Sequence, residues 1–156
     1  MKKIYALLLA AVMLLGITGC VQEEKRISLE DVMAKIALTY DLPDEMVQIQ
    51  SEEDLMNYYG IASGDVLQYQ AQINGSGVEQ DEIVMIQAKD SGAKAVVEAK
   101  LNERYQSKLS STKNYLPDQY NMLKKCKVQT SGNYICMFLS KDAEGMTNIY
   151  NSYLKE

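Results

Sequence analysis

Glu82-Ile83-Val84-Met85-Ile86-Gln87-Ala88-Lys89 is the stretch that decides the fold, because nearly every side chain between its charged ends is apolar. A short run of this kind predicts a strand that is buried on both faces and therefore lies inside a sheet. The segment 66–73 before it alternates polar and apolar residues from Leu67 onward, and a Gly-containing turn at 74–77 with an acidic stretch separates the two. We predict an antiparallel hairpin in which the second strand is central and the first more exposed.

The segment that follows this hairpin predicts the longest helix of the chain. Asp90-Ser91 supplies its N-cap, and apolar residues recur every four positions from residue 93 to about residue 110. A second hairpin at 126–140 and an amphipathic helix from 141 onward come next. The remaining elements are a helix at 28–41, a strand at 46–50, a helix at 52–58 and a short helix that opens at Pro117. The pattern predicts a single α+β domain, with a mainly antiparallel sheet of about four to five strands and helices packed on one face.

The N-terminus has the layout of a secretory leader. Met1-Lys2-Lys3 is basic, residues 4–15 are apolar without interruption, and Ile17-Thr18-Gly19-Cys20 follows. The apolar run is shorter than the roughly 17–25 residues that a membrane-spanning helix needs, so we expect the leader to be removed. Ile17-Thr18-Gly19-Cys20 resembles the lipobox of bacterial lipoproteins. This resemblance implies a diacylglyceryl group on the Cys20 sulfur and cleavage between Gly19 and Cys20.

A diacylglyceryl group attaches a protein stably, because two acyl chains suffice where one is marginal. We therefore expect a lipoprotein signal peptide at 1–19, the lipidated Cys20 with a short tether at 20–27, and one folded domain at 28–156. The protein would be secreted across the cytoplasmic membrane and anchored to its outer face. The alternative is that Cys20 is an ordinary residue in an uncleaved leader.

The composition excludes several classes of function. The chain has 16 Lys+Arg against 21 Asp+Glu, a net charge of −5, and loss of Lys2 and Lys3 with the leader makes the mature chain more negative. Nucleic-acid binding needs a basic face, and the basic residues here are outnumbered and scattered, so we expect no nucleic-acid partner. The chain has no His, which removes the commonest general base, the His-dependent nucleophile pairs and the usual zinc and iron sites.

Two cysteines, Cys126 and Cys136, remain after lipidation, in a compartment where disulfides persist. A three-residue loop at Thr130-Ser131-Gly132 would place them directly opposite each other across the second hairpin, which makes a cross-strand disulfide a candidate. The alternative is a pair of free, buried thiols. A metal site from two sulfurs without His or nearby carboxylate ligands is not expected.

Three charged residues form a candidate ligand contact where the central strand meets the long helix: Glu82, Lys89 and Arg104. The planar guanidinium of Arg104 is suited to a carboxylate or phosphate of a ligand. The alternative is that Arg104 pairs with a local carboxylate, such as Glu103 or Asp118, and fixes a turn.

Tyrosine is the main aromatic residue, with eleven Tyr, one Phe and no Trp. Tyr115 and other tyrosines could line a recognition surface, since Tyr offers rigid amphipathic area; the alternative is a core that uses Tyr in place of Phe and Trp. The acidic clusters at 52–54 and 79–82 lack the ligand spacing of a calcium loop, which favours solvated capping residues. We expect no catalytic residue, metal or cofactor.

Three stretches together resemble a family of uncharacterised lipoproteins from Gram-positive bacteria of the Firmicute type, a domain of unknown function numbered forty-three fifty-eight. They are Leu55 through Tyr59-Gly60-Ile61, Glu82-Ile83 followed by Lys89, and Arg104 followed by Tyr115-x-Pro117 and Gly132-Asn133-Tyr134. The resemblance covers most of residues 30–150. It implies a lipid-anchored envelope protein and brings no activity with it.

These observations favour a non-catalytic module of the cell envelope. We expect it to bind the membrane through its diacylglyceryl anchor and to bind another envelope protein, a peptidoglycan component or a small ligand. Two alternatives stay open: an envelope enzyme that uses carboxylates to act on a glycan, and an accessory subunit of an envelope complex.

Overall fold

The structure, a computed structural model, describes residues 26–155 and has an antiparallel sheet at its centre. Within those residues the sheet has five strands in the order β1-β2-β3-β5-β4. The strands are β1 Met46–Gln48, β2 Val66–Asn74, β3 Glu82–Ala88, β4 Val128–Ser131 and β5 Tyr134–Leu139. The helices are α2 Leu29–Thr39, α3 Glu52–Tyr59, α4 Ser91–Thr112, α5 Pro117–Leu123 and α6 Ala143–Lys155, with a 3₁₀ turn, η1, at Ser63–Asp65. The predicted α+β class and the antiparallel sheet are confirmed.

Strand β3 is the centre of the sheet, as its apolar run predicted. All seven of its residues are buried, and it pairs with β2 on one side and β5 on the other. Its side chains alternate between two separate clusters of buried residues, with Val84 and Ile86 in one and Ile83 and Met85 in the other. The sheet therefore has a hydrophobic core on each face.

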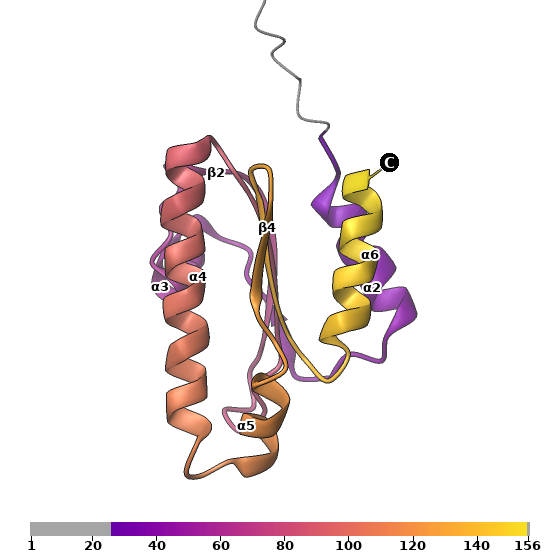
Figure 1. Ribbon diagram of the computed structural model, residues 1–156, viewed down its shortest axis with the longest axis vertical. Helices are drawn as coiled ribbons and strands as arrows, with labels where there is room; N and C mark the ends of the chain where they lie inside the picture. The colour runs from indigo at the N-terminus through magenta and orange to yellow at the C-terminus, as the bar shows by residue number, and fades with distance from the viewer. Residues whose placement is uncertain (1–25, 156) are drawn as a thin grey trace, which may run out of the picture.

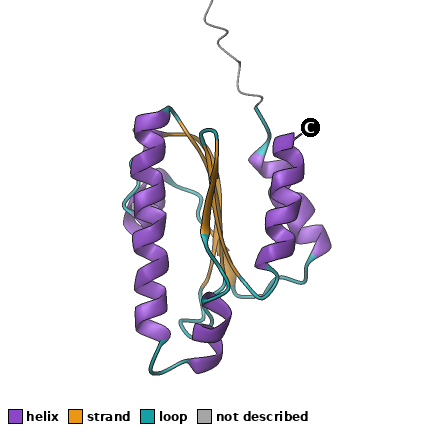
Figure 2. Cartoon of the chain, in the orientation of Figure 1, coloured by secondary structure: helices purple, strands orange, loops and turns teal. Residues whose placement is uncertain are grey.

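Helices cover both of these faces, and the prediction of helices on one face is wrong on this point. Figure 1 shows the sheet nearly edge-on, with α3 and α4 on one side and α2 and α6 on the other. The strands lie between the two helical layers, as Figure 2 shows by colour. The physical reason is the burial of β3 and β5 on both faces, because each face needs its own apolar cover.

The helices begin where the sequence predicts, because their N-caps are local features. Ser28, Ser51 and Asp90 each accept a hydrogen bond from the backbone N–H three residues on, at 3.1, 3.0 and 2.9 Å. In α6, Gly145 allows close approach to α2, because a β carbon there would overlap the Tyr40 hydroxyl. Within residues 26–155 no helix combines the length and the apolar character that crossing a bilayer requires.

The predicted register of the second hairpin is wrong, and with it the candidate disulfide. Ser131 pairs with Tyr134, so the turn has two residues, and Cys136 lies opposite Gln129. Cys126 belongs to the core cluster under α4, whereas Cys136 belongs to the cluster under α2 and α6. Both thiols are free and buried, because the register places them on opposite faces of the sheet.

Candidate functional site

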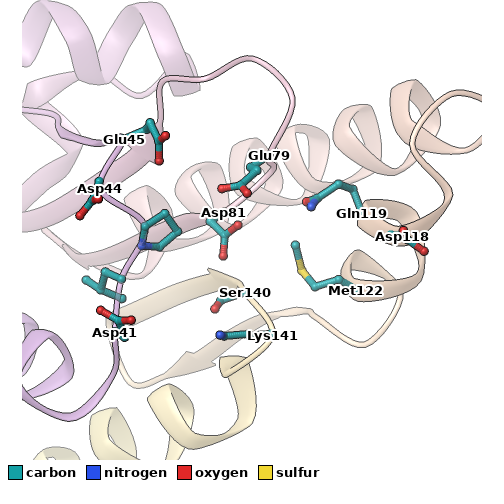
Figure 3. Close-up of a pocket in the computed structure, with 12 residues that line it drawn as sticks. Asp41, Asp44, Glu45, Glu79, Asp81, Asp118, Gln119, Met122, Ser140 and Lys141 are labelled. Carbon is teal, nitrogen blue, oxygen red and sulfur yellow. The ribbon is translucent and has the colours of Figure 1, made fainter.

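A pocket of about 570 Å³ opens at one end of the sheet, where four segments meet. These segments are the α2–β1 loop, the β2–β3 loop, the start of α5 and the β5–α6 loop. Carboxylates dominate its lining: Asp41, Asp44, Glu45, Glu79, Asp81 and Asp118. Lys141 is the one basic residue among the lining side chains. Figure 3 shows these side chains around the opening, with Asp81 near the middle and close to Ser140. We call this feature the acidic pocket.

The carboxylates of the acidic pocket form no close ion pair within the part of the chain that the structure describes. There, the carboxylates within 4.0 Å of a lysine or arginine nitrogen are those of Glu82 and Glu103, and neither lines the pocket. Hydrogen bonds from amide groups hold the loop segments of the pocket instead. The Asn74 amide donates to Glu79 at 3.0 Å, and the Gln80 backbone N–H donates to the Gln119 side chain at 2.9 Å. The second of these bonds joins the β2–β3 loop to α5.

Asp81 is the pocket carboxylate whose pKa is shifted by its surroundings. Burial, and then the neighbouring Glu79 carboxylate, raise the pKa of Asp81, although a hydrogen bond with Ser140 opposes the shift. A carboxylate with a raised pKa in a pocket holds its proton more tightly than one in water. An approaching positive charge would favour the ionised form.

Replacement of Asp81 by Asn is expected to stabilise the fold at neutral pH. Because the folded state raises the pKa of Asp81, stability falls as pH rises from the unfolded value, about 3.9, through the folded value. The Asp81→Asn protein lacks this ionisation and keeps an acceptor for Ser140. Urea unfolding at pH 7 should give a higher midpoint with an unchanged slope, and the gain should shrink below about pH 4.

The exposed Asp44 offers a matched control for this prediction, since it lines the same pocket. Asp44→Asn should leave the urea midpoint nearly unchanged. Equal midpoints for the Asp81→Asn and wild-type proteins at neutral pH would contradict the prediction.

A second charged feature, a buried ion cluster, lies on the α4 face of the sheet. Glu82 is fully buried and accepts from Arg104 Nε at 3.3 Å and from Arg104 Nη2 at 3.0 Å, while Lys108 Nζ lies 2.9 Å from the same carboxylate. Burial alone would lower the pKa of Arg104, but Glu82 outweighs it and the pKa is raised. The Arg104 guanidinium also lies 5.8 Å from the centre of the Tyr59 ring. Arg104 is thus engaged by the fold itself.

The structure brings together only part of the predicted ligand contact. Arg104 meets Glu82, whereas the alternative partners Glu103 and Asp118 are wrong, since Glu103 pairs with Lys100 at 3.0 Å. Lys89 is exposed beyond the other end of β3, where its backbone N–H donates to Asp65 at 2.9 Å.

Tyr115, which was predicted to contact a ligand as part of a recognition surface, lies apart from both charged features. It is 84% exposed in the turn between α4 and α5 and lines neither the acidic pocket nor the ion cluster. Tyr59, Tyr134 and Tyr150 are buried, so these three tyrosines belong to the core. Gly19 and Cys20, the predicted cleavage and lipidation site, lie outside the described residues.

The acidic pocket was not found from the sequence because its residues come from separate segments. The acidic stretch 79–82 was the sequence feature that could have indicated the pocket, but its residues divide between two sites. Glu79 and Asp81 line the pocket, whereas Glu82 faces α4 and joins the ion cluster. No local sequence pattern around Asp41, Asp44 or Asp118 indicated that they belong to a pocket.

The chemistry of the pocket is that of acceptors and negative charge. Across residues 26–155 no group of three or more Cys, Asp or Glu side chains is arranged to hold a metal ion. The pocket lining includes no cysteine and no arginine, and its polar groups besides the carboxylates are Gln119, Ser140 and Lys141. The arrangement suits a ligand that carries positive charge and hydrogen-bond donors.

Comparison with known protein families gives a match. The family model described as Domain of unknown function (DUF4358) matches residues 39–140. Searches of curated proteins and of solved structures gave no match. The matched range runs from the end of α2 to the end of β5, so it contains the sheet, α3, α4, α5 and the acidic pocket except for Lys141.

Proposed function

Because the chain belongs to the family described as Domain of unknown function (DUF4358), whose description indicates no catalytic class, we propose its function from its N-terminal motif and its pocket. The protein is a lipid-anchored module of the outer face of the cytoplasmic membrane that binds a positively charged ligand in the acidic pocket. The supporting observation is a pocket of about 570 Å³ whose carboxylates lie within 4.0 Å of no lysine or arginine nitrogen among residues 26–155.

Electrostatics give the pocket its preference for cations. Like charges gathered in a concave surface reinforce one another, and the low-dielectric walls concentrate their field. A ligand with ammonium or guanidinium groups gains attraction from several carboxylates at once and relieves the repulsion between Asp81 and Glu79. Basic protein segments and amino-bearing wall components both have this chemistry.

The test measures binding of a short lysine-containing peptide to the soluble domain by isothermal titration calorimetry, with a glutamate-containing peptide of equal length as the control. The Asp44→Asn/Glu79→Gln variant should bind the basic peptide about tenfold more weakly, since each exposed ion pair contributes up to about 1 kcal/mol. Binding should also weaken between about 0.05 M and 0.5 M salt because of screening.

The matched control is Glu30→Gln/Glu53→Gln, which removes two exposed carboxylates outside the pocket and changes the net charge equally. It should bind the peptide like the wild-type protein. An equal loss in both double variants would show that attraction depends on net charge alone and would contradict a pocket-specific site.

A carboxylate-dependent enzyme acting on a glycan is the second candidate, and one observation favours it. Asp81 has a raised pKa and lies beside the exposed Glu79 carboxylate, and glycan-cleaving enzymes use a pair of carboxyl groups. Incubation with purified peptidoglycan and measurement of released reducing ends separates the two candidates. Release that is lost in the Asp81→Asn variant would favour the enzyme.

A further inference from the structure

The N-terminal segment of the domain is fixed to one end of the sheet. The Ile27 N–H donates to the Tyr134 hydroxyl at 3.1 Å, and the Ile27 carbonyl accepts from the Gln68 amide at 2.7 Å. The Gln68 side chain also accepts from the Leu29 N–H at 3.2 Å and donates to Gln87 at 2.8 Å. Ile27 itself is only 6% exposed and belongs to the core cluster under α2 and α6. The chain therefore enters the domain at a defined point.

This entry point and the acidic pocket lie at opposite ends of the sheet. Gln68 is near the start of β2, Gln87 near the end of β3 and Tyr134 at the start of β5. The pocket is formed by segments that follow β2, precede β3 and follow β5. Strand β3, Glu82–Ala88, runs between the two ends and spans roughly 20 Å at about 3.3 Å per residue. In Figure 1 the described chain begins, before α2, at the end of the domain opposite α5.

The length of the tether limits how the domain can lie on a membrane. Six residues lie between Cys20 and Ile27, and the seven Cα–Cα steps from one to the other reach at most about 25 Å when the chain is fully extended. To place the acidic pocket on the bilayer, the tether would have to run back along nearly the full strand length. That needs almost complete extension, which is costly in conformational entropy.

The negative charge of the acidic pocket favours the same orientation as the short tether. The outer surface of a membrane that contains anionic lipids repels negative groups over about a Debye length, roughly 8 Å in physiological salt. The carboxylates of the acidic pocket, which form no close ion pair among the described residues, would meet this repulsion if the pocket faced the membrane.

We infer that the entry end of the sheet, where β2 and β5 start and β3 ends, faces the membrane. The acidic pocket at the other end is then directed away from it. This inference rests on the proposed lipidation of Cys20. It narrows the ligand of the pocket to a positively charged group that arrives from the wall or solvent side, and it excludes the lipid headgroups of the membrane that holds the anchor.

The test compares energy transfer from two labelled positions to an acceptor on lipid headgroups. Lys89→Cys places a donor dye at the entry end, and Val78→Cys places one in the β2–β3 loop, where Val78 is 58% exposed. Cys126 and Cys136 are buried, and the unsubstituted protein treated with the same dye measures any labelling of them. The full lipidated chain is reconstituted in phosphatidylcholine vesicles that contain phosphatidylglycerol.

Transfer should be about twofold more efficient from the Lys89→Cys protein than from the Val78→Cys protein, since about 20 Å of strand separates the two ends. Equal transfer, or stronger transfer from the Val78→Cys protein, would overturn the orientation. The Cys20→Ser chain should stay off the vesicles. If the unsubstituted chain also stays off them, the anchor and the orientation both fail, while peptide binding by the soluble domain tests the pocket separately.

Discussion

Replacement of Glu82 by Ala is expected to lower the free energy of unfolding by about 3–5 kcal/mol, because it leaves two cations without their shared partner in a largely buried site. The Glu82 side chain is fully buried, while the Arg104 and Lys108 side chains are 29% and 12% exposed. Lys108 also donates to the Gln80 carbonyl at 3.2 Å, so the cluster helps to hold the loop that forms one wall of the acidic pocket. Urea unfolding followed by circular dichroism measures the effect.

Two controls distinguish the effect of removing this buried carboxylate from the effect of removing a carboxylate in general. Glu103 lies on α4, as Arg104 and Lys108 do, and pairs with Lys100, but its side chain is 69% exposed. Glu103→Ala should therefore lower the free energy of unfolding by less than about 1 kcal/mol. Glu82→Leu combined with Arg104→Met and Lys108→Met removes the whole cluster and should recover most of the stability lost in Glu82→Ala. A Glu82→Ala cost no larger than that of Glu103→Ala would contradict the assigned role of the cluster.

The central strand and the helix starts could be predicted because their signals are local. The run 82–89 has no polar face to expose, and Ser28, Ser51 and Asp90 are N-cap residues that act within three positions. The same run should also have predicted helices on both faces of the sheet. A strand buried on both faces of a sheet needs a helical layer on each side, and α2 and α6 supply the second one.

The register of the second hairpin could not be fixed from the sequence, because loops of two and three residues both fit around Gly132. In the structure Gly132 has a φ of 54° and Asn133 does not have a positive φ, which is typical of a two-residue turn with glycine at its first central position. The turn at Gly132-Asn133 moves the partner of Cys136 from the expected Cys126 to Gln129, a shift of three residues (129 − 126) that alters which side chains share a face. The expected pairing of Cys126 with Cys136 depended on that choice.

The acidic pocket could not be predicted for a different reason. Its carboxylates lie between Asp41 and Asp118 in segments that share no motif, and each segment alone reads as a solvated loop or a helix start. Only the strand order brings them together, since β2, β3 and β5 are neighbours in the sheet and their connecting segments meet at one end. The assembly of the pocket is a consequence of topology.

Substitutions of Tyr150 in α6 are expected to change stability in opposite directions. Tyr150 is 1% exposed, and its ring lies 6.0 Å from Phe138 of β5 in an edge-to-face arrangement. Tyr150→Ala leaves a cavity in this layer and should cost about 3–5 kcal/mol. The Tyr150 hydroxyl is buried without a hydrogen-bond partner among the described residues, so Tyr150→Phe should stabilise the fold by about 1 kcal/mol. Urea unfolding of the two variants beside the wild-type protein measures both effects.

The pair of variants tests whether the layer of α2 and α6 is part of the stable fold. A loss in Tyr150→Phe would mean that the hydroxyl has a partner, and a negligible cost in Tyr150→Ala would mean that the layer is dispensable. The family match ends at residue 140 and begins at residue 39, so both helices lie almost wholly outside it. Yet Phe138 and Met85, inside the matched range, are buried beneath these helices. A segment limited to 39–140 would leave that face of the sheet in water, and the flanking helices are therefore part of the folding unit that holds the acidic pocket in place.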